Sequence, residues 1–138
     1  MYIQRKIALI DWDGTIRDGY TIKEWIKFLI KNSNKKDDLI LETINKMFID
    51  YQKGILSHDQ LADITAQIYA DYLNGLDTTY INHLAKEFLS QDEKRLFSYS
   101  IKLFELLHNL KIQTVVISGC PSVILDLYKE MQKQGVRL

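Results

Sequence analysis

The chain has 138 residues, of which 46% are hydrophobic and 26% charged, a balance that excludes a disordered tail, a collagen-like chain and a disulfide-rich scaffold. Eighteen basic residues offset eighteen acidic ones, so neither nucleic acid nor anionic lipid is an expected partner. The single cysteine, and the lack of both a membrane-length apolar run and a signal-peptide core, predict a cytoplasmic protein without a membrane partner.

Two short segments, residues 7–10 and 114–117, predict β-strands. Both are continuous apolar runs without alternation, which is typical of parallel strands covered on both faces. The first run ends at Asp11 and the second at Ser118. Ligands of α/β proteins bind at the carboxyl ends of such strands, so these two ends are the candidate site.

The segment between the two strands predicts helices. Apolar stripes occur in residues 22–29, 40–51, 61–72, 81–88 and 103–110. Ser57 and Gln60 form a capping-box pattern, and a last helix is expected to begin at Pro121.

The helices outnumber what a sheet connection requires. A strand–helix–strand crossover needs only one helix, so we interpret residues 18–97 as an inserted all-α cap. Residues 1–17 and 98–138 would then form an incomplete α/β core with a Rossmann-like parallel sheet.

The strongest chemical signal is Asp11-Trp12-Asp13-Gly14-Thr15. Two carboxylates at a strand end can act as nucleophile and general acid/base, and they can also gather Mg²⁺. The simpler alternative is a strand-to-turn corner, where Asp and Gly are common. A buried apolar run leading into two acids favours a site with a compensating ion.

This motif resembles the first motif of the haloacid dehalogenase (HAD) superfamily of phosphatases. The family's second motif is an apolar strand ending in Ser or Thr, which Val115-Val116-Ile117-Ser118-Gly119 matches. The 107 residues between Asp11 and Ser118 (118 − 11) leave room for a cap between the motifs, as in the phosphoserine-phosphatase-like branch.

The resemblance implies roles for the two acids. Asp11 would attack phosphorus and form an aspartyl-phosphate, and Asp13 would protonate the leaving alcohol and later deprotonate water. The Asp11 carboxylate and the Asp13 carbonyl would bind Mg²⁺. The implied substrate is a small phosphorylated metabolite.

The resemblance also implies the residues around the acids. Gly14 and Thr15 would form the turn at the phosphate, with Thr15 orienting Asp13. Ser118 and the Gly119 N–H would bind the phosphoryl group. Arg17 and Asp18, at the start of the cap, are candidates for substrate contact.

The chain departs from the family pattern in its later motifs. The family's third motif is a Lys or Arg and its fourth an acidic pair, and no counterpart follows Ser118 here; Lys129 and Lys133 are expected to face solvent. We therefore expect an N-terminal portion or truncated form of such an enzyme, weak or inactive alone. The unpaired edge of the first strand is expected to favour self-association. The alternative function is a catalytically inactive remnant that binds a ligand or a partner.

Overall fold

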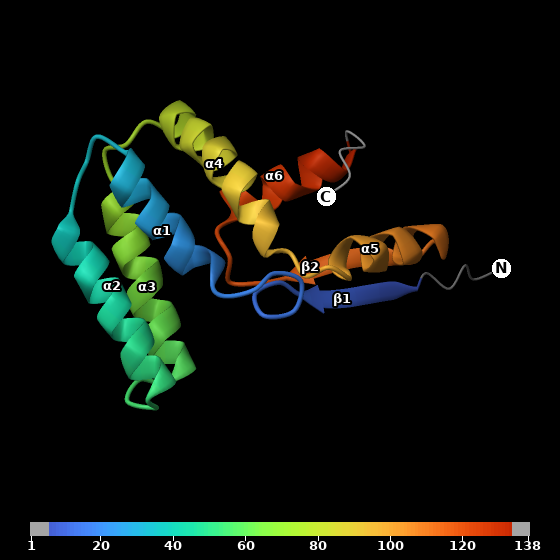
Figure 1. Cartoon of the computed structure of the whole chain (residues 1–138), viewed down its shortest axis with the longest axis horizontal. Coiled ribbons are helices and arrows are strands. Elements are labelled where there is room, and N and C mark those ends of the chain that lie inside the picture. The colour runs from blue at the N-terminus through green and yellow to red at the C-terminus, as the bar shows by residue number, and fades with distance from the viewer. Residues whose placement is uncertain (1–5, 134–138) are drawn as a thin grey trace. The chain divides into compact units, whose positions relative to one another are not determined.

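The computed structural model describes residues 6–133, with the side chains of residues 6–131. It is a mixed α/β fold (Figure 1). Its elements, in chain order, are β1 (Ile7–Asp11), α1 (Thr21–Asn32), α2 (Asp38–Gln52), α3 (His58–Leu73), α4 (Thr78–Asp92), the 3₁₀ helix η1 (Glu93–Arg95), α5 (Ser100–Asn109), β2 (Gln113–Ile117) and α6 (Ser122–Lys133). Among the described residues, no helix combines the length and apolar character needed to cross a bilayer.

The two predicted strands pair in parallel, as expected. The register runs from Ile7 opposite Gln113 to Asp11 opposite Ile117. Both strands therefore end at the same level, and the segments that follow Asp11 and Ile117 leave the sheet at the carboxyl end of the strands. This places the two sequence motifs side by side.

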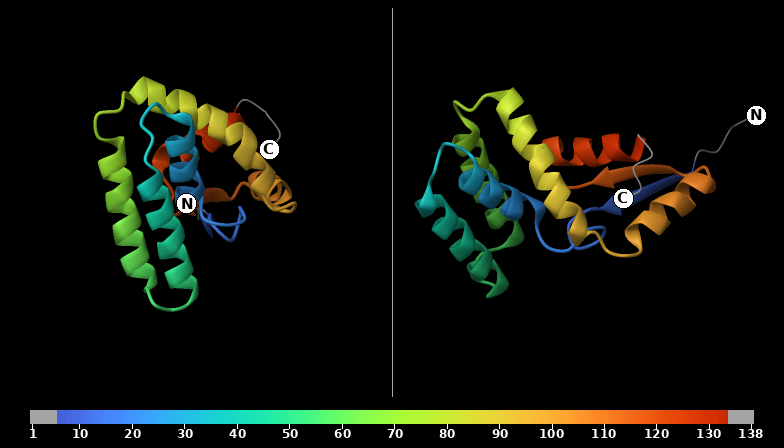
Figure 2. Two further views of the ribbon diagram at one scale, coloured as in Figure 1. Left: turned by 60° about the vertical axis from the view of Figure 1, so that its left-hand side comes forward. Right: turned by 45° about the horizontal axis from the view of Figure 1, so that its top comes forward.

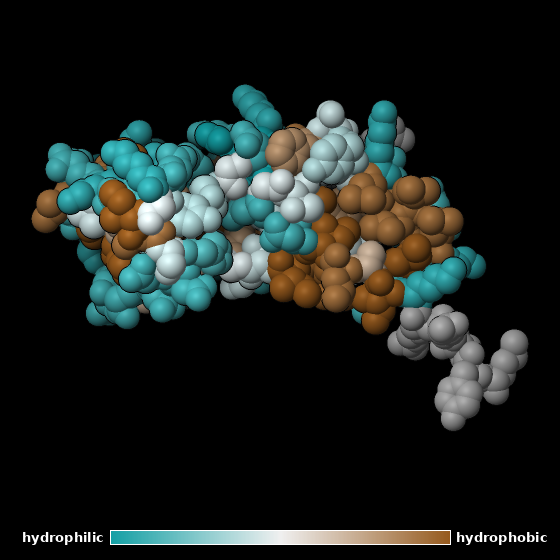
Figure 3. Space-filling model, turned by 90° about the horizontal axis from the view of Figure 1, so that it is seen from below, coloured by the Kyte–Doolittle hydropathy of each residue, from teal (hydrophilic) through white to brown (hydrophobic). Residues whose placement is uncertain are grey.

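The expectation that both strands are covered on both faces is wrong for the described residues. Ile7, Leu9 and Ile117 are 56%, 67% and 59% exposed, whereas Ala8 and Ile10, which alternate with them, are partly buried. An apolar run shows that the side chains are suited to burial, but burial also requires other elements packed on each face of the sheet. The two described strands have too few such elements to cover both faces. Figure 3 shows apolar surface gathered on one face of this part of the chain.

The chain divides into two compact units: a core unit, residues 1–21 and 89–138, and a helical unit, residues 22–88. The cap was expected over residues 18–97, and its role as a cap stays a prediction. Helices α1–α4 lie where apolar stripes predicted helices (Figure 2). At the start of α3 the capping box forms, since Ser57 and Gln60 each accept the other's backbone N–H.

The helical unit has its own apolar core. Trp25 is fully buried and packs on Phe88, with ring centroids 5.3 Å apart. The Trp25 indole N–H donates to the Tyr69 hydroxyl at 3.1 Å, which satisfies its polar atom. The amphipathic stripes read from the sequence thus bury one face of each helix.

In the core unit, the segment after β1 is hydrogen-bonded to the segment before α5. The Ile16 carbonyl accepts from the Phe97 N–H at 3.0 Å and from the Ser100 hydroxyl at 2.7 Å. The Asp18 N–H donates to the Arg95 carbonyl at 2.9 Å. These bonds fix the loop that follows β1, which carries most of the predicted site residues.

Candidate functional site

A tight turn carries the chain out of β1. The Trp12 carbonyl accepts from the N–H groups of Thr15, Ile16 and Arg17, and Gly14 has φ +79°. That left-handed conformation carries little steric penalty for glycine. The turn redirects the chain while keeping both acids close to the end of the strand.

Asp11 closes β1 and is exposed to solvent. The Thr15 hydroxyl donates to Asp11 Oδ2 at 2.8 Å, which holds the carboxylate in one orientation. No other hydrogen bond to Asp11 is found among the described residues, so Oδ1 is available to a ligand. The Asp11 carboxylate is therefore both oriented and accessible to solvent.

Asp13 lies in a different environment, half-buried beside the start of α1. Both of its oxygens lie 3.0 Å from the Thr21 backbone N–H, and Oδ1 also accepts from the Thr21 hydroxyl. Arg17 Nη1 lies 3.9 Å from Oδ1. Burial raises the pKa of Asp13, against the opposing effect of the Thr21 hydrogen bonds and the Arg17 charge.

A buried ion pair lies behind Asp13. Arg17 is fully buried, and its Nε donates to Asp92 Oδ2 at 2.8 Å while Nη2 donates to Asp92 Oδ1. The Tyr128 hydroxyl donates to Asp92 Oδ2 at 2.9 Å, and Arg17 Nη1 donates to the Asp18 carbonyl at 2.8 Å. Burial alone would lower the pKa of Arg17, but Asp92 outweighs it and raises the pKa. The guanidinium therefore stays charged next to Asp13.

The loop after β2 supplies the other side of the site. The Ser118 hydroxyl accepts from the Cys120 N–H at 3.0 Å and keeps its own O–H free to donate. Gly119 is exposed and has open space around its Cα. The Pro121 carbonyl accepts the first helical bond, from Ile124 at 3.0 Å, so α6 begins one residue later than predicted.

Cys120 confirms that the two strand ends converge. Its thiol is buried and interacts with Thr21 and with the charge of Asp13, although β1 and β2 are far apart in sequence. Burial, with a further contribution from Asp13, raises the pKa of the thiol to about 12. A thiol that stays protonated is a packing residue and a poor nucleophile.

Two sequence-based roles need correction. Thr15 was expected to orient Asp13, but its hydroxyl holds Asp11; Thr21 holds Asp13 instead. Arg17 was expected to touch substrate, but it is fully buried and directed at Asp92. Asp18 is exposed, and its substrate contact stays a prediction.

Three site residues were missed from the sequence: Thr21, Asp92 and Tyr128. Thr21 begins α1, where a hydroxyl residue was readable as a helix start. Asp92 and Tyr128 gave no signal, because each lies within or at the end of a helical stripe. Only the folded chain brings them to Arg17.

The described residues offer few side-chain ligands for a metal ion at this site. Among residues 6–133 there is no group of three His, Cys, Asp or Glu side chains able to hold a metal. Asp11 offers a free carboxylate oxygen, whereas the Asp13 carboxylate is occupied by Thr21. A single carboxylate oxygen does not by itself make a metal site, so Mg²⁺ binding at Asp11 stays a prediction.

Comparison of the chain with protein-family models, with curated proteins and with solved structures finds no match.

Proposed function

We propose that the chain carries the nucleophile and the acid/base of a HAD-type, Mg²⁺-dependent phosphomonoester hydrolase. The observation that supports this most is the contrast between the two acids at the end of β1. Asp11 is exposed and held by Thr15, whereas Asp13 is half-buried with a raised pKa. Two neighbouring acids in unlike environments are typical of a base or nucleophile next to an acid.

In the first step, Asp11 Oδ1 attacks phosphorus and the bond from phosphorus to the leaving oxygen breaks. Protonated Asp13 gives its proton to that oxygen, so an alcohol departs and an aspartyl-phosphate remains. In the second step, the Asp13 carboxylate accepts a proton from water while the water oxygen attacks phosphorus. Inorganic phosphate leaves and Asp11 is restored.

The surroundings of Asp13 suit both steps. A carboxyl group with a raised pKa is protonated more often near neutral pH than a free aspartate, which favours donation. The Thr21 hydrogen bonds and the nearby Arg17 charge stabilise the carboxylate that forms afterwards. Asp13 therefore has support in each protonation state.

Ser118 and Gly119 would bind the phosphoryl oxygens from the β2 side. The Ser118 O–H and the Gly119 N–H are both donors at the strand end next to Asp11. Bound at Asp11, Mg²⁺ would offset negative charge on those oxygens.

A ligand- or partner-binding module without turnover is the second candidate. It is favoured by the state of Arg17, because this cation is fully buried and directed at Asp92 rather than at the exposed Asp11. A cation 4 Å from the reacting phosphate would stabilise it by about 4 kcal/mol at an effective dielectric of 20, and this stabilisation is lost when Arg17 is directed at Asp92. Expressed fully in the transition state, this loss would slow the reaction roughly a thousandfold.

The test compares Asp11→Asn with the control Glu105→Gln, which neutralises an exposed acid of α5 outside the site. Each purified chain is incubated with p-nitrophenyl phosphate with and without Mg²⁺, and phosphorylated peptides are sought by mass spectrometry. We expect slow, Mg²⁺-dependent hydrolysis that Asp11→Asn abolishes and Glu105→Gln retains, with phosphate on the peptide containing Asp11. Activity that persists in Asp11→Asn would refute the nucleophile. No turnover and no phosphorylated peptide, together with binding of phosphate, would select the second candidate.

A further inference from the structure

Tyr99 is hydrogen-bonded to the residue that orients Asp11. The Tyr99 hydroxyl donates to the Thr15 carbonyl, and the Thr15 hydroxyl donates to Asp11 Oδ2 at 2.8 Å. Asp11 is exposed, so water competes for the Thr15 hydroxyl. Holding a side chain in one geometry costs conformational entropy, and this cost is smaller when the backbone that carries it is already fixed. The orientation of Asp11 therefore depends on how firmly Thr15 is held.

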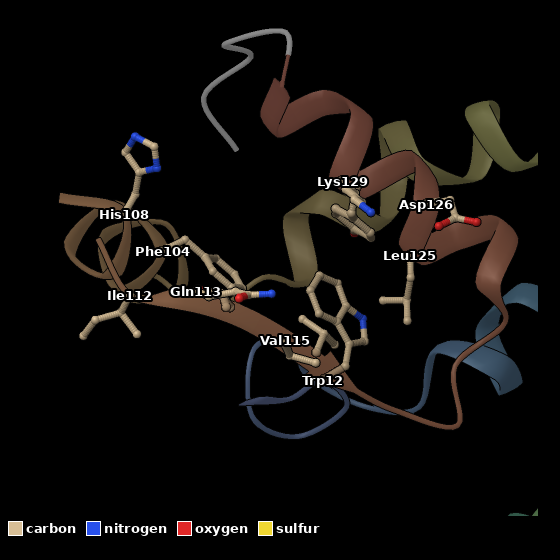
Figure 4. Close-up of a pocket in the computed structure, with 12 residues that line it drawn as sticks. Trp12, Phe104, His108, Ile112, Gln113, Val115, Leu125, Asp126 and Lys129 are labelled. Carbon is tan, nitrogen blue, oxygen red and sulfur yellow. The ribbon is translucent and has the colours of Figure 1, made fainter. Parts of the chain in front are cut away.

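The backbone of Thr15 is held on both sides. Its N–H donates to the Trp12 carbonyl at 3.2 Å, and its carbonyl accepts from Tyr99. Trp12 is itself fixed, because it is buried against Tyr128, with ring centroids 4.9 Å apart, and its ring lines a cavity inside the core unit (Figure 4). Thr15 is β-branched, so a fixed backbone leaves its side chain little rotational freedom. Its hydroxyl is thereby directed at Asp11.

Tyr99 is a rigid donor although its side chain is half-exposed. Its carbonyl accepts from the Leu103 N–H at 2.9 Å, so its backbone is anchored to the first turn of α5. Its ring stacks on Phe97, with centroids 5.6 Å apart and planes 8° apart. The Tyr99 hydroxyl is therefore in place before any substrate arrives, and the free chain is already organised at this point.

Tyr99 differs from its neighbours in the carbonyl that it holds. Residues 97–100 donate hydrogen bonds to two consecutive carbonyls of the turn after β1. The Phe97 N–H and the Ser100 hydroxyl both donate to Ile16, whereas the Tyr99 hydroxyl donates to Thr15, 84 positions away in the chain. Ile16 is thus held twice, and the path from this segment to Asp11 passes through Tyr99.

We propose that Tyr99 is a positioning residue for Asp11: its hydroxyl fixes the Thr15 backbone, so that the Thr15 hydroxyl holds one carboxylate oxygen and leaves Oδ1 free to attack. The orientation of Asp11 is a property of the free chain, whereas the effect on the reaction rests on the proposed function. Tyr99 acts through Thr15 and does not touch the substrate. Its loss should therefore lower kcat and leave KM unchanged, because orientation matters when the bond to phosphorus forms.

The test compares Tyr99→Phe with a matched control, Ser100→Ala. Tyr99→Phe removes the hydroxyl and keeps the ring that stacks on Phe97. Ser100→Ala also removes a hydroxyl that donates to a carbonyl of the turn, at 2.7 Å, but that carbonyl belongs to Ile16 and keeps the Phe97 N–H as a donor. Ser100 is buried, so its variant should destabilise the core unit at least as much. General loosening of the turn would then affect both variants alike.

The first readout is the χ1 rotamer of Asp11 and of Thr15 in the chain without ligand, from three-bond couplings measured by NMR. Each side chain should hold one rotamer in the wild type and in Ser100→Ala, and both should average over staggered rotamers in Tyr99→Phe. The second readout is Mg²⁺-dependent hydrolysis of p-nitrophenyl phosphate. Tyr99→Phe should lower kcat about fivefold, the equivalent of one neutral hydrogen bond, with KM unchanged. Ser100→Ala should leave both constants unchanged.

The two readouts separate failure of this proposal from failure of the proposed function. A single Asp11 rotamer in Tyr99→Phe, or equal averaging in Ser100→Ala, would overturn the role of Tyr99. In a chain that turns over, an unchanged kcat in Tyr99→Phe, or a change confined to KM, would overturn it as well. A wild-type chain without any hydrolysis would refute the proposed function, and the Asp11 rotamers alone would then decide whether Tyr99 holds this carboxylate.

Discussion

Replacing Asp92 with Asn should destabilise the core unit severely, although the two side chains have nearly the same shape. Asp92 accepts two hydrogen bonds from Arg17 and one from Tyr128, all in a buried environment. The amide loses the charge, and its NH₂ group must face a donor. Arg17 would then remain buried with Asp13 3.9 Å away as its nearest acid among the described residues.

The magnitude follows from these contacts. Each hydrogen bond to a charged group contributes about 1.5–3 kcal/mol, and the Asn side chain has only one oxygen, without charge, to accept from Arg17 in place of two carboxylate oxygens. Breaking one side of a buried ion pair typically costs about 3–5 kcal/mol. We therefore expect a loss of about 3 kcal/mol in the free energy of unfolding, a large part of the roughly 5–15 kcal/mol that stabilises a domain.

Urea unfolding followed by ¹⁹F NMR of 5-fluorotryptophan can separate the two units, because Trp12 lies in the core unit and Trp25 in the helical unit. With a urea m-value of about 1–3 kcal/mol/M, the Trp12 midpoint should fall by about 1–3 M. The control Asp126→Asn removes an exposed carboxylate and should change stability by less than about 0.5 kcal/mol. The double variant Arg17→Met/Asp92→Leu should recover most of the loss. A cost below about 1 kcal/mol for Asp92→Asn, or a double variant as unstable as the sum of the singles, would refute the reasoning.

Three further predictions concern single sites. Thr21→Val removes a hydrogen bond that favours the Asp13 carboxylate, so the pKa of Asp13 should rise further and its ¹³C carboxyl titration should move to higher pH; a move to lower pH would contradict the assigned cause. Under the proposed mechanism, the alkaline limb of a pH–rate profile should move in the same direction, because protonated Asp13 is the acid. Ser57→Ala should destabilise the helical unit by about 1 kcal/mol, read from the Trp25 signal, whereas Ser98→Ala, an exposed serine outside any helix cap, should leave that signal unchanged. Cys120, with a pKa of about 12, should react with iodoacetamide at pH 8 far more slowly than glutathione does. Once the chain is unfolded in urea, the two thiols should react at the same rate. Fast labelling of the folded chain would show that the Cys120 thiol is not buried.

The elements were predictable because they depend on local pattern, and the parallel pairing because short apolar runs without alternation are typical of parallel strands. Apolar stripes at helical spacing, the Ser57–Gln60 capping box and the two apolar runs each encode structure within a few residues. The exposure of Leu9 was not predictable in this way, because burial depends on how many other elements lie against a face.

The candidate site was predictable only where its residues are adjacent in sequence. Asp11 and Asp13 could be identified from their motif, and parallel pairing brings Ser118 beside them. The partners of Arg17 come from residues 92 and 128, whose selection depends on packing between segments distant in sequence. The sequence therefore suggested that a cation was lacking near the acids, whereas the fold holds one behind Asp13.

The hydrogen bonds between the loop after β1 and the segment before α5 have a consequence for the order of folding. The Ile16 carbonyl and the Phe97 N–H are 81 residues apart (97 − 16), so forming this bond closes a long loop in the unfolded chain. The entropy lost on closure grows by about 0.6 kcal/mol for each doubling of loop length. Trp25 of α1 packs on Phe88 of α4, so folding of residues 22–88 brings the two ends of that segment together, and the remaining flexible loop is much shorter. Early formation of residues 22–88 would therefore accelerate the pairing of β1 with β2, although none of the candidate site residues lies within that segment.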